Sequence, residues 1–247
     1  MPKVMILGGT AEAGELAARL AGDARLDTVT SLAGLTRLPN VSGHVRRGGF
    51  GGPDGLAQTL STEGYDALID ATHPFAGQIA RHAAEAAERA GVPRIKLVRP
   101  GFERLPGDHF IEVADMTEAA AAIPEGARVF LAAGRREARA FAGRKDLWCL
   151  VRMIEPPVAG EEMPRGEVIL GRPPTDPEKE MALLAEHRIE WIVSKDSGGR
   201  ASAKIEAARR LKIPVVLVRR PAPPSGPQAA QLEAILAWLE ETLFPAP

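Results

Sequence analysis

Three glycines close to the N-terminus have a spacing that suits nucleotide chemistry. An apolar run, Val4–Leu7, leads into Gly8 and Gly9, and Gly14 follows five residues after Gly9. Glycines allow a tight turn and a close approach of the backbone to a ligand, and the N–H groups that open the following helix attract an anion. Ala11 stands where the dinucleotide fingerprint has its middle glycine. The pattern favours phosphate binding, and an ordinary strand-to-helix turn is the alternative.

The end of the second expected strand carries residues that would select the nucleotide. An NAD-binding domain places an acidic residue there, which binds the ribose 2′-hydroxyl. This chain has Ser31, Thr36 and Arg37 instead, and Asp27 lies at the other end of the strand. Hydroxyl and guanidinium groups donate hydrogen bonds to phosphate, so we expect these three residues to surround the 2′-phosphate of NADPH. A polar turn with a solvated arginine is the alternative.

The third and fourth expected strands end in segments that suit a flat ligand. The third strand runs into a glycine-rich loop with Gly49 and Phe50, and the fourth is followed by Thr72, His73 and Pro74. Glycines let the backbone approach a ring, and His73 would lie beside the nicotinamide of a bound dinucleotide. A mobile loop and a histidine that caps or packs against the next helix are the alternatives.

Basic residues follow two expected strands in the second half of the chain. The first segment has Arg135 and Arg136, and the second has Lys195, Asp196, Ser197, Gly198, Gly199 and Arg200. Both segments run into helices, so their backbone N–H groups and cations can converge on one acidic ligand. A substrate with several carboxylates would explain this cluster. Solvated surface charges beside a serine–glycine cap are the alternative.

Composition narrows the classes of protein that remain. The chain has 247 residues, of which 45% are hydrophobic and 26% charged, and its formal net charge is −1. This balance gives no general attraction to nucleic acid or to an anionic membrane. No apolar run approaches the ~18 residues of a membrane span, and the N-terminus lacks the pattern of a secretory signal. We therefore expect a cytoplasmic protein that binds neither nucleic acid nor membrane.

Other kinds of chemistry find little support. The single cysteine, Cys149, excludes an internal disulfide, and its apolar neighbours predict a buried thiol. No histidines and carboxylates have metal-ligand spacing, and neither a serine nucleophile elbow nor a Walker phosphate loop occurs. We expect no metal site and no acyl transfer.

Short apolar runs alternate with amphipathic segments, which is typical of parallel sheets connected by helices. The expected strands lie near residues 3–8, 27–32, 44–47, 66–71, 93–98, 109–113, 128–133, 147–153, 167–170, 189–194 and 213–218. The expected helices lie near 11–22, 53–62, 75–91, 115–122, 135–142, 177–187, 200–211 and 227–243. The fold class is therefore α/β, with two Rossmann-like domains that each have a parallel sheet, and with an active-site cleft between them.

The motifs occur in the order found in one enzyme family. The segments Gly8–Ala13, Ser31–Gly34, Asp70–Ala76 and Ser194–Gly199 resemble those of precorrin-6A reductases of cobalamin biosynthesis, over nearly the whole chain. The resemblance implies an NADPH-dependent reduction of one double bond in a ring-contracted tetrapyrrole. Precorrin-6A would become precorrin-6B by hydride delivery to a ring carbon and protonation of its neighbour. Residues 1–100 would then be the NADPH-binding domain, and 107–247 the domain that binds the tetrapyrrole.

The resemblance also implies roles for individual residues. The pyrophosphate and nicotinamide would be lined by Gly9, Thr10, Ala11, Glu12 and Ala13, and by Thr72, His73 and Pro74. Lys195, Asp196, Ser197, Gly198 and Gly199 would meet the macrocycle. Lys195, Asp196 and His73 are the catalytic candidates. The proton donor stays open among water, a substrate carboxyl group, Lys195 and His73.

Three other functions are compatible with the motifs. The enzyme could act on a cobalt-containing precorrin-6A with NADH, the chain could be a non-catalytic module that senses NADP(H), or it could be a glycosyltransferase-like enzyme that uses a sugar nucleotide. Basic residues in the second half favour a reductase over a sensor. We expect a monomer or a weak homo-oligomer.

Overall fold

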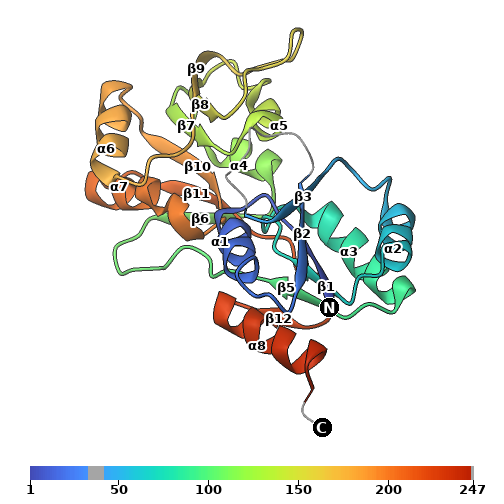
Figure 1. Cartoon of the computed structure of the whole chain (residues 1–247). Helices are drawn as coiled ribbons and strands as arrows, with labels where there is room; N and C mark the ends of the chain where they lie inside the picture. The colour runs from blue at the N-terminus through green and yellow to red at the C-terminus, as the bar shows by residue number, and fades with distance from the viewer. Residues whose placement is uncertain (33–41, 246–247) are drawn as a thin grey trace. The chain divides into compact units, whose positions relative to one another are not determined.

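The computed structural model describes residues 1–32 and 42–245, which form two compact units. The first unit combines residues 1–99 with the segment from residue 221 onward, and the second comprises residues 100–220. Each unit contains one six-stranded sheet, and every strand pairing within the two sheets is parallel. The α/β fold with two parallel sheets is therefore confirmed (Figure 1).

The sheet of the first unit has the strand order β12-β5-β4-β1-β2-β3. Its strands are β1 (Lys3–Leu7), β2 (Asp27–Leu32), β3 (His44–Arg47), β4 (Ala67–Asp70), β5 (Arg94–Leu97) and β12 (Gln228–Ala229). Its helices are α1 (Ala11–Leu20), α2 (Pro53–Thr62), α3 (Gly77–Ala90) and α8 (Leu232–Leu243).

Alternate side chains of β1 face two different helix layers, as expected for a strand buried on both faces. Val4 and Ile6 belong to a core cluster with α1 and α8. Met5 and Leu7 belong to a second cluster with α2 and α3. The continuous apolar run at the N-terminus therefore lies in the sheet that forms the central layer of a three-layer unit.

The sheet of the second unit has the strand order β6-β11-β10-β7-β8-β9. Its strands are β6 (Phe110–Val113), β7 (Arg128–Ala132), β8 (Trp148–Met153), β9 (Gly166–Leu170), β10 (Trp191–Lys195) and β11 (Val215–Val218). Its helices are α4 (Met116–Ala122), α5 (Arg135–Ala138), α6 (Pro177–Glu186) and α7 (Ala203–Leu211), with short 3₁₀ turns at Arg139–Phe141 and Gly199–Ser202. The helix expected at 200–211 therefore begins as a 3₁₀ turn.

The C-terminal segment corrects the expected domain boundary. Residues 107–247 do not form one domain, because β12 pairs with β5 of the first unit. The backbone N–H of Lys96 donates to Pro227 O and that of Val98 donates to Ala229 O. Residues 228 and 229 of the expected helix 227–243 thus form a strand. The helix α8, red in Figure 1, contributes Leu232, Ile235 and Leu239 to the core cluster that includes residues of α1.

Cys149 lies on β8 and is fully buried, as the sequence predicted. Desolvation by burial raises the pKa of its thiol to about 12. A thiol with such a pKa is a poor nucleophile near neutral pH, so Cys149 is a packing residue. No helix within the described ranges is long and apolar enough to cross a membrane. Over the same ranges, no group of three or more His, Cys, Asp or Glu side chains could hold a metal ion.

The turn between β1 and α1 depends on Gly8 and Gly9. A Cβ on Gly8 would lie 3.0 Å from Thr30 Cγ2, and Gly9 has a φ of +108°. Gly14 lies inside α1 with no neighbouring atom within 4 Å of a Cβ added there. Close packing of helix on strand, the usual reason for the last fingerprint glycine, therefore does not apply to Gly14.

We expect Gly14→Ala to stabilise the protein by about 0.5–1 kcal/mol, because alanine loses less conformational entropy in a helix than glycine does. Urea unfolding followed by circular dichroism measures this change. Gly9→Ala is the matched control and should destabilise the protein, because its φ is unfavourable for a residue with a Cβ. A lower free energy of unfolding for Gly14→Ala would contradict this account of the turn.

Candidate functional site

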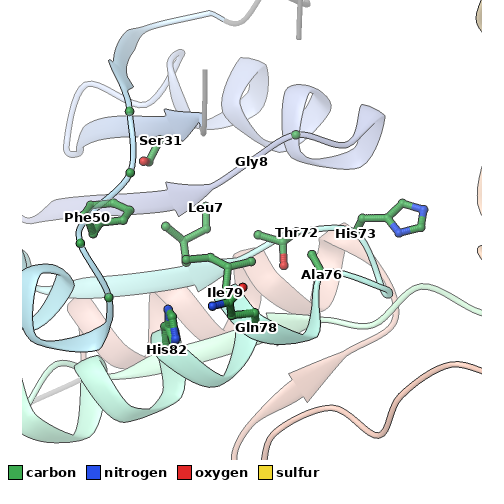
Figure 2. A pocket seen from close by; sticks show the side chains of 15 residues that line it. Leu7, Gly8, Ser31, Phe50, Thr72, His73, Ala76, Gln78, Ile79 and His82 are labelled. Atoms are coloured by element: carbon green, nitrogen blue, oxygen red, sulfur yellow. The ribbon is translucent and has the colours of Figure 1, made fainter. Parts of the chain in front are cut away.

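A pocket of about 430 Å³ opens at the carboxyl edge of the first unit's sheet (Figure 2). It is lined by Leu7, Gly8, Gly9, Ser31, Gly48, Gly49, Phe50, Gly51, Gly52, Thr72, His73, Ala76, Gln78, Ile79 and His82. Glycines and apolar side chains form most of this lining, which suits a flat organic ligand. Six of the residues expected to bind a cofactor are here: Gly9, Ser31, Gly49, Phe50, Thr72 and His73.

Strand register brings these residues together. Leu7 of β1 pairs with Ser31 of β2 on one side and with Asp70 of β4 on the other. The turn is then fixed by side-chain and backbone contacts: Gly8 N–H donates to Ser31 O over 2.9 Å, and the Thr10 hydroxyl donates to Ala71 O over 2.9 Å. The N-terminus of α1 is therefore held at the pocket.

The other expected cofactor residues lie around or outside this pocket. Thr10, Glu12 and Pro74 line a smaller adjacent cavity together with Thr72 and Arg99. Ala11 is exposed and Ala13 is buried, both in the first turn of α1, and neither lines either cavity. Thr36 and Arg37 lie outside the described residues.

The beginning of α1 has the electrostatics of an anion site. Thr10 is its N-cap and accepts a hydrogen bond from Ala13 N–H over 3.1 Å. Glu12, in the first turn, is paired with Arg99, whose Nη1 lies 2.6 Å from Glu12 Oε2. Because the carboxylate is neutralised, the positive end of the helix dipole remains open to an anionic ligand.

Arg46 holds the glycine-rich loop that forms one wall of the pocket. Its guanidinium donates to Gly48 O over 2.9 Å and to Gly49 O over 3.3 Å. The same guanidinium lies 3.9 Å from the centroid of the Phe50 ring, which is a cation–π contact. Phe50 thus presents an aromatic surface that contacts the Arg46 guanidinium.

His73 makes local hydrogen bonds in the turn before α3 and does not cap that helix. Its Nδ1 accepts a hydrogen bond from Phe75 N–H over 3.2 Å, and its carbonyl accepts one from Ala76 N–H over 2.8 Å. Figure 2 shows its ring pointing away from Leu7 and Phe50. The helix α3 begins at Gly77, two residues later than the expected start, with Ala76 as its N-cap.

Sequence reasoning missed the wall that α3 contributes. Gln78, Ile79 and His82 line the pocket from the first turns of this helix. The expected helix at 75–91 contains all three residues, and Gln78 and His82 lie four residues apart on either side of Ile79 in the sequence. Polar residues at the edge of an apolar helix face could have indicated a site on this helix. Their position at the pocket depends on how α3 packs on the sheet, which the sequence pattern does not give.

The expected basic cluster of the second unit is partly assembled. β7 and β10 are neighbours, with Ser194 paired with Ala132, so the segments after them emerge side by side. Lys195 Nζ lies 2.5 Å from Glu137 Oε1 in this region. Arg135 Nε lies 3.5 Å from Glu161 Oε2, and Arg136 is exposed. The side chain of Arg200 is outside the described part of the chain.

The Asp196 carboxylate is engaged in contacts with other residues of the same chain. Its Oδ1 accepts from Phe102 N–H over 2.8 Å, and its Oδ2 lies 3.3 Å from Arg104 Nη2. Ser197 and Gly198 are buried, and Gly199 is exposed. A Cβ on Gly198 would lie 2.0 Å from Pro100 O, so only glycine allows this close approach of the two segments.

Comparisons with known proteins show the family of this chain. The family model described as precorrin-6x reductase CbiJ/CobK matches residues 3–240. The chain belongs to this family. It is similar to the precorrin-6A reductase of Rhodococcus erythropolis, with 45% identity over 97% of this chain and 98% of that protein. A precorrin-6A reductase of a Sinorhizobium species is 44% identical over 99% of this chain and 95% of that protein.

A solved structure of a CobK precorrin-6A reductase matches with a TM-score of 0.92 and 38% identity, covering 98% of this chain and 97% of that one. The resemblance that the motifs indicated is therefore confirmed for the family. The pocket of this precorrin-6x reductase family member lies in the unit that the sequence predicted to bind the nucleotide.

Gly55 gives a direct test of the pocket wall. It lies in the first turn of α2, and a Cβ there would lie 1.8 Å from the carbonyl oxygen of Phe50. Gly55→Ala must displace this backbone, and overpacking of this kind costs about 1–3 kcal/mol. We expect the dissociation constant for NADPH, measured by nicotinamide fluorescence, to rise by roughly tenfold.

Gly14→Ala is the matched control for this experiment, because it also adds a methyl group to a helical glycine of the first unit but meets no neighbour. It should bind NADPH like the unaltered protein. Equal affinities for Gly55→Ala and Gly14→Ala would show that the position of Phe50 does not matter for the nucleotide.

Proposed function

We propose that this chain is an NADPH-dependent precorrin-6A reductase of cobalamin biosynthesis, and that its product is precorrin-6B. The observation that carries the proposal is the pocket at the carboxyl edge of the first unit, where Gly8, Gly9 and the start of α1 adjoin an aromatic wall. Family membership supports the substrate class, and the lining of the pocket is compatible with a dinucleotide cofactor. The sensor alternative leaves the basic segments of the second unit without a purpose.

The residues at the pocket fit a nicotinamide dinucleotide. The open N–H groups at the start of α1 would bind the pyrophosphate, and the paired Glu12 would not repel it. The Phe50 ring, backed by Arg46, offers a flat surface for the adenine. Ser31 lines the pocket where the adenosine ribose would lie, and we assign the 2′-phosphate to Ser31, Thr36 and Arg37.

The reaction needs one hydride and one proton. When bound, NADPH supplies the hydride for a ring carbon of the macrocycle, and the adjacent carbon takes a proton, so that NADP⁺ and a substrate with one double bond fewer remain. The protein mainly has to orient the two reactants and exclude water.

Polar groups of the second unit would bind the carboxylates of the tetrapyrrole. We assign this role to Arg135, Arg136, Lys195, Ser197, Gly198, Gly199 and Arg200. Lys195 carries an ammonium beside Glu137, so a substrate carboxylate can replace or share that partner. Both oxygens of the Asp196 carboxylate already accept hydrogen bonds, so its contribution would be to hold the backbone of this segment. Lys195 and His73 remain the side chains proposed as proton donors.

The direct test mixes the purified protein with NADPH and precorrin-6A and follows the loss of nicotinamide absorbance together with the mass of the tetrapyrrole. We expect one NADPH to be oxidised for each macrocycle that gains two hydrogens. A parallel assay with cobalt-precorrin-6A and NADH tests the alternative substrate and cofactor. Intact precorrin-6A with no oxidation of NADPH would overturn the proposal, and binding of NADPH without turnover of either tetrapyrrole would favour a sensor.

Cofactor preference is tested at Arg37. A guanidinium–phosphate hydrogen bond contributes about 1.5–3 kcal/mol, so Arg37→Ala should weaken NADPH binding by roughly 10- to 100-fold and leave NADH binding unchanged. Steady-state KM values for the two nucleotides measure this. Arg25→Ala is the control, because Arg25 precedes the other end of β2 and pairs with Asp23 and Glu240. A similar change for both nucleotides in Arg37→Ala would remove Arg37 from the 2′-phosphate site.

A further inference from the structure

A buried ion pair lies directly behind the pocket. Asp70 ends β4 and is fully buried, and Lys96 of β5 is its register partner. Lys96 Nζ lies 2.8 Å from Asp70 Oδ2, and the Lys96 side chain is only 5% exposed. Charged groups are rarely buried unless they are paired, and Lys96 is the partner that allows this carboxylate to be buried.

The second oxygen of Asp70 fixes Thr72. Asp70 Oδ1 accepts from Thr72 N–H over 3.1 Å and from the Thr72 hydroxyl over 2.6 Å. The hydroxyl bond is short, as is typical of a bond to an ionised acceptor. Thr72 is 8% exposed and lines the pocket, where Figure 2 shows its side chain between Leu7 and Ala76.

This contact decides what Thr72 can offer to a ligand. A hydroxyl has one hydrogen, and here that hydrogen is donated to Asp70, which as a carboxylate has no hydrogen to return. The Thr72 oxygen therefore presents only lone pairs to the pocket. A phosphate oxygen at this position would be repelled, and an N–H or O–H group would be bound.

The place of Thr72 indicates which part of a dinucleotide meets it. β2 and β4 flank β1 on opposite sides, so Ser31 and Thr72 lie on opposite sides of the glycine turn. A dinucleotide with its pyrophosphate at the start of α1 extends its two nucleosides to these two sides. If the 2′-phosphate lies near Ser31, then the nicotinamide nucleoside lies near Thr72.

We propose that Asp70 is a positioning residue, which fixes the Thr72 hydroxyl as a hydrogen-bond acceptor for a donor group of the nicotinamide nucleoside, either the carboxamide N–H or a ribose O–H. This inference rests on the proposed function, because it assumes that the pocket binds NADPH. Lys96 balances the charge that this arrangement places inside the protein.

Arg94, two residues before Lys96 on β5, is the other cation near this carboxylate. Burial lowers its pKa, and the negative charge of Asp70 opposes that shift. Its Nη2 donates to Ser225 O over 2.6 Å, so it bonds to the C-terminal segment of the first unit rather than to Thr72. The contact that orients the hydroxyl is therefore that of Asp70 alone among the residues described.

The first test compares Thr72→Val with Thr72→Ser. Valine keeps the shape and removes the acceptor, so the dissociation constant for NADPH should rise by roughly tenfold, the effect of one lost hydrogen bond. Serine keeps the hydroxyl and should restore most of the affinity. Thr62→Val is the matched control, because the Thr62 hydroxyl donates to Gln58 O on the exposed side of α2 and should not affect binding.

An NADPH analogue with an acetyl group in place of the carboxamide distinguishes the two donors. If Thr72→Val loses no affinity for this analogue, the carboxamide N–H is the donor; if the loss persists, a ribose hydroxyl is the donor. Both results support the proposal. If the unaltered protein binds NADPH and Thr72→Val binds it equally well, the inference is wrong; if the unaltered protein does not bind NADPH, the proposed function itself fails.

The role of Asp70 needs a double-mutant cycle. The amide of Asp70→Asn can donate to the Thr72 oxygen, which frees the hydroxyl hydrogen, so we expect a loss of affinity similar to that of Thr72→Val. The double variant should lose no more than either single one, because both remove the same acceptor. If Asp70→Asn does not fold, Asp70→Asn combined with Lys96→Met removes both charges and enters the same cycle. Additive losses would show that Asp70 does not act through Thr72.

Discussion

The parallel pairing of β1 with β2 and β4 is the constraint on which the site depends. Because Leu7 is in register with Ser31 and with Asp70, the residues that follow all three strands emerge together at one edge of the sheet. The turn at Gly8 and the cap at Thr10 are then bonded to those same neighbours, through Ser31 O and Ala71 O. A shift of one residue in either pairing would turn the side chains of the strand to the opposite face and separate these groups.

Much of this arrangement could be predicted from local patterns. An apolar run that leads into glycine, a helix that stops before Gly91 and a helix that begins at Pro53 could be predicted, because each of these signals is contained in a few residues. The pairing of the C-terminal segment with the first unit's sheet could not be predicted in this way. β12 is only two residues long and has no periodicity, and it forms a strand because β5 has an open edge and α8 covers an apolar layer of the first unit.

The residues of the candidate site also differ in whether local sequence patterns could predict them. Gly9, Ser31, Phe50 and Thr72 were expected, because ligands of parallel sheets bind beyond the carboxyl ends of strands. The contribution of α3 was missed, because it depends on how a helix packs rather than on where a strand ends. Asp196 shows the opposite difficulty: its position after β10 suggested chemistry, but its carboxylate holds the backbone of Phe102, a residue far away in the sequence.

Two acidic side chains near the candidate sites are paired with cations. Glu12 lies at the start of α1 but pairs with Arg99, and Glu137 pairs with Lys195 in the second unit. An unpaired carboxylate at either place would repel an anion. The sequence has 31 basic and 32 acidic residues, so an attraction to an anionic ligand would have to come from local groups such as the start of α1 rather than from the net charge.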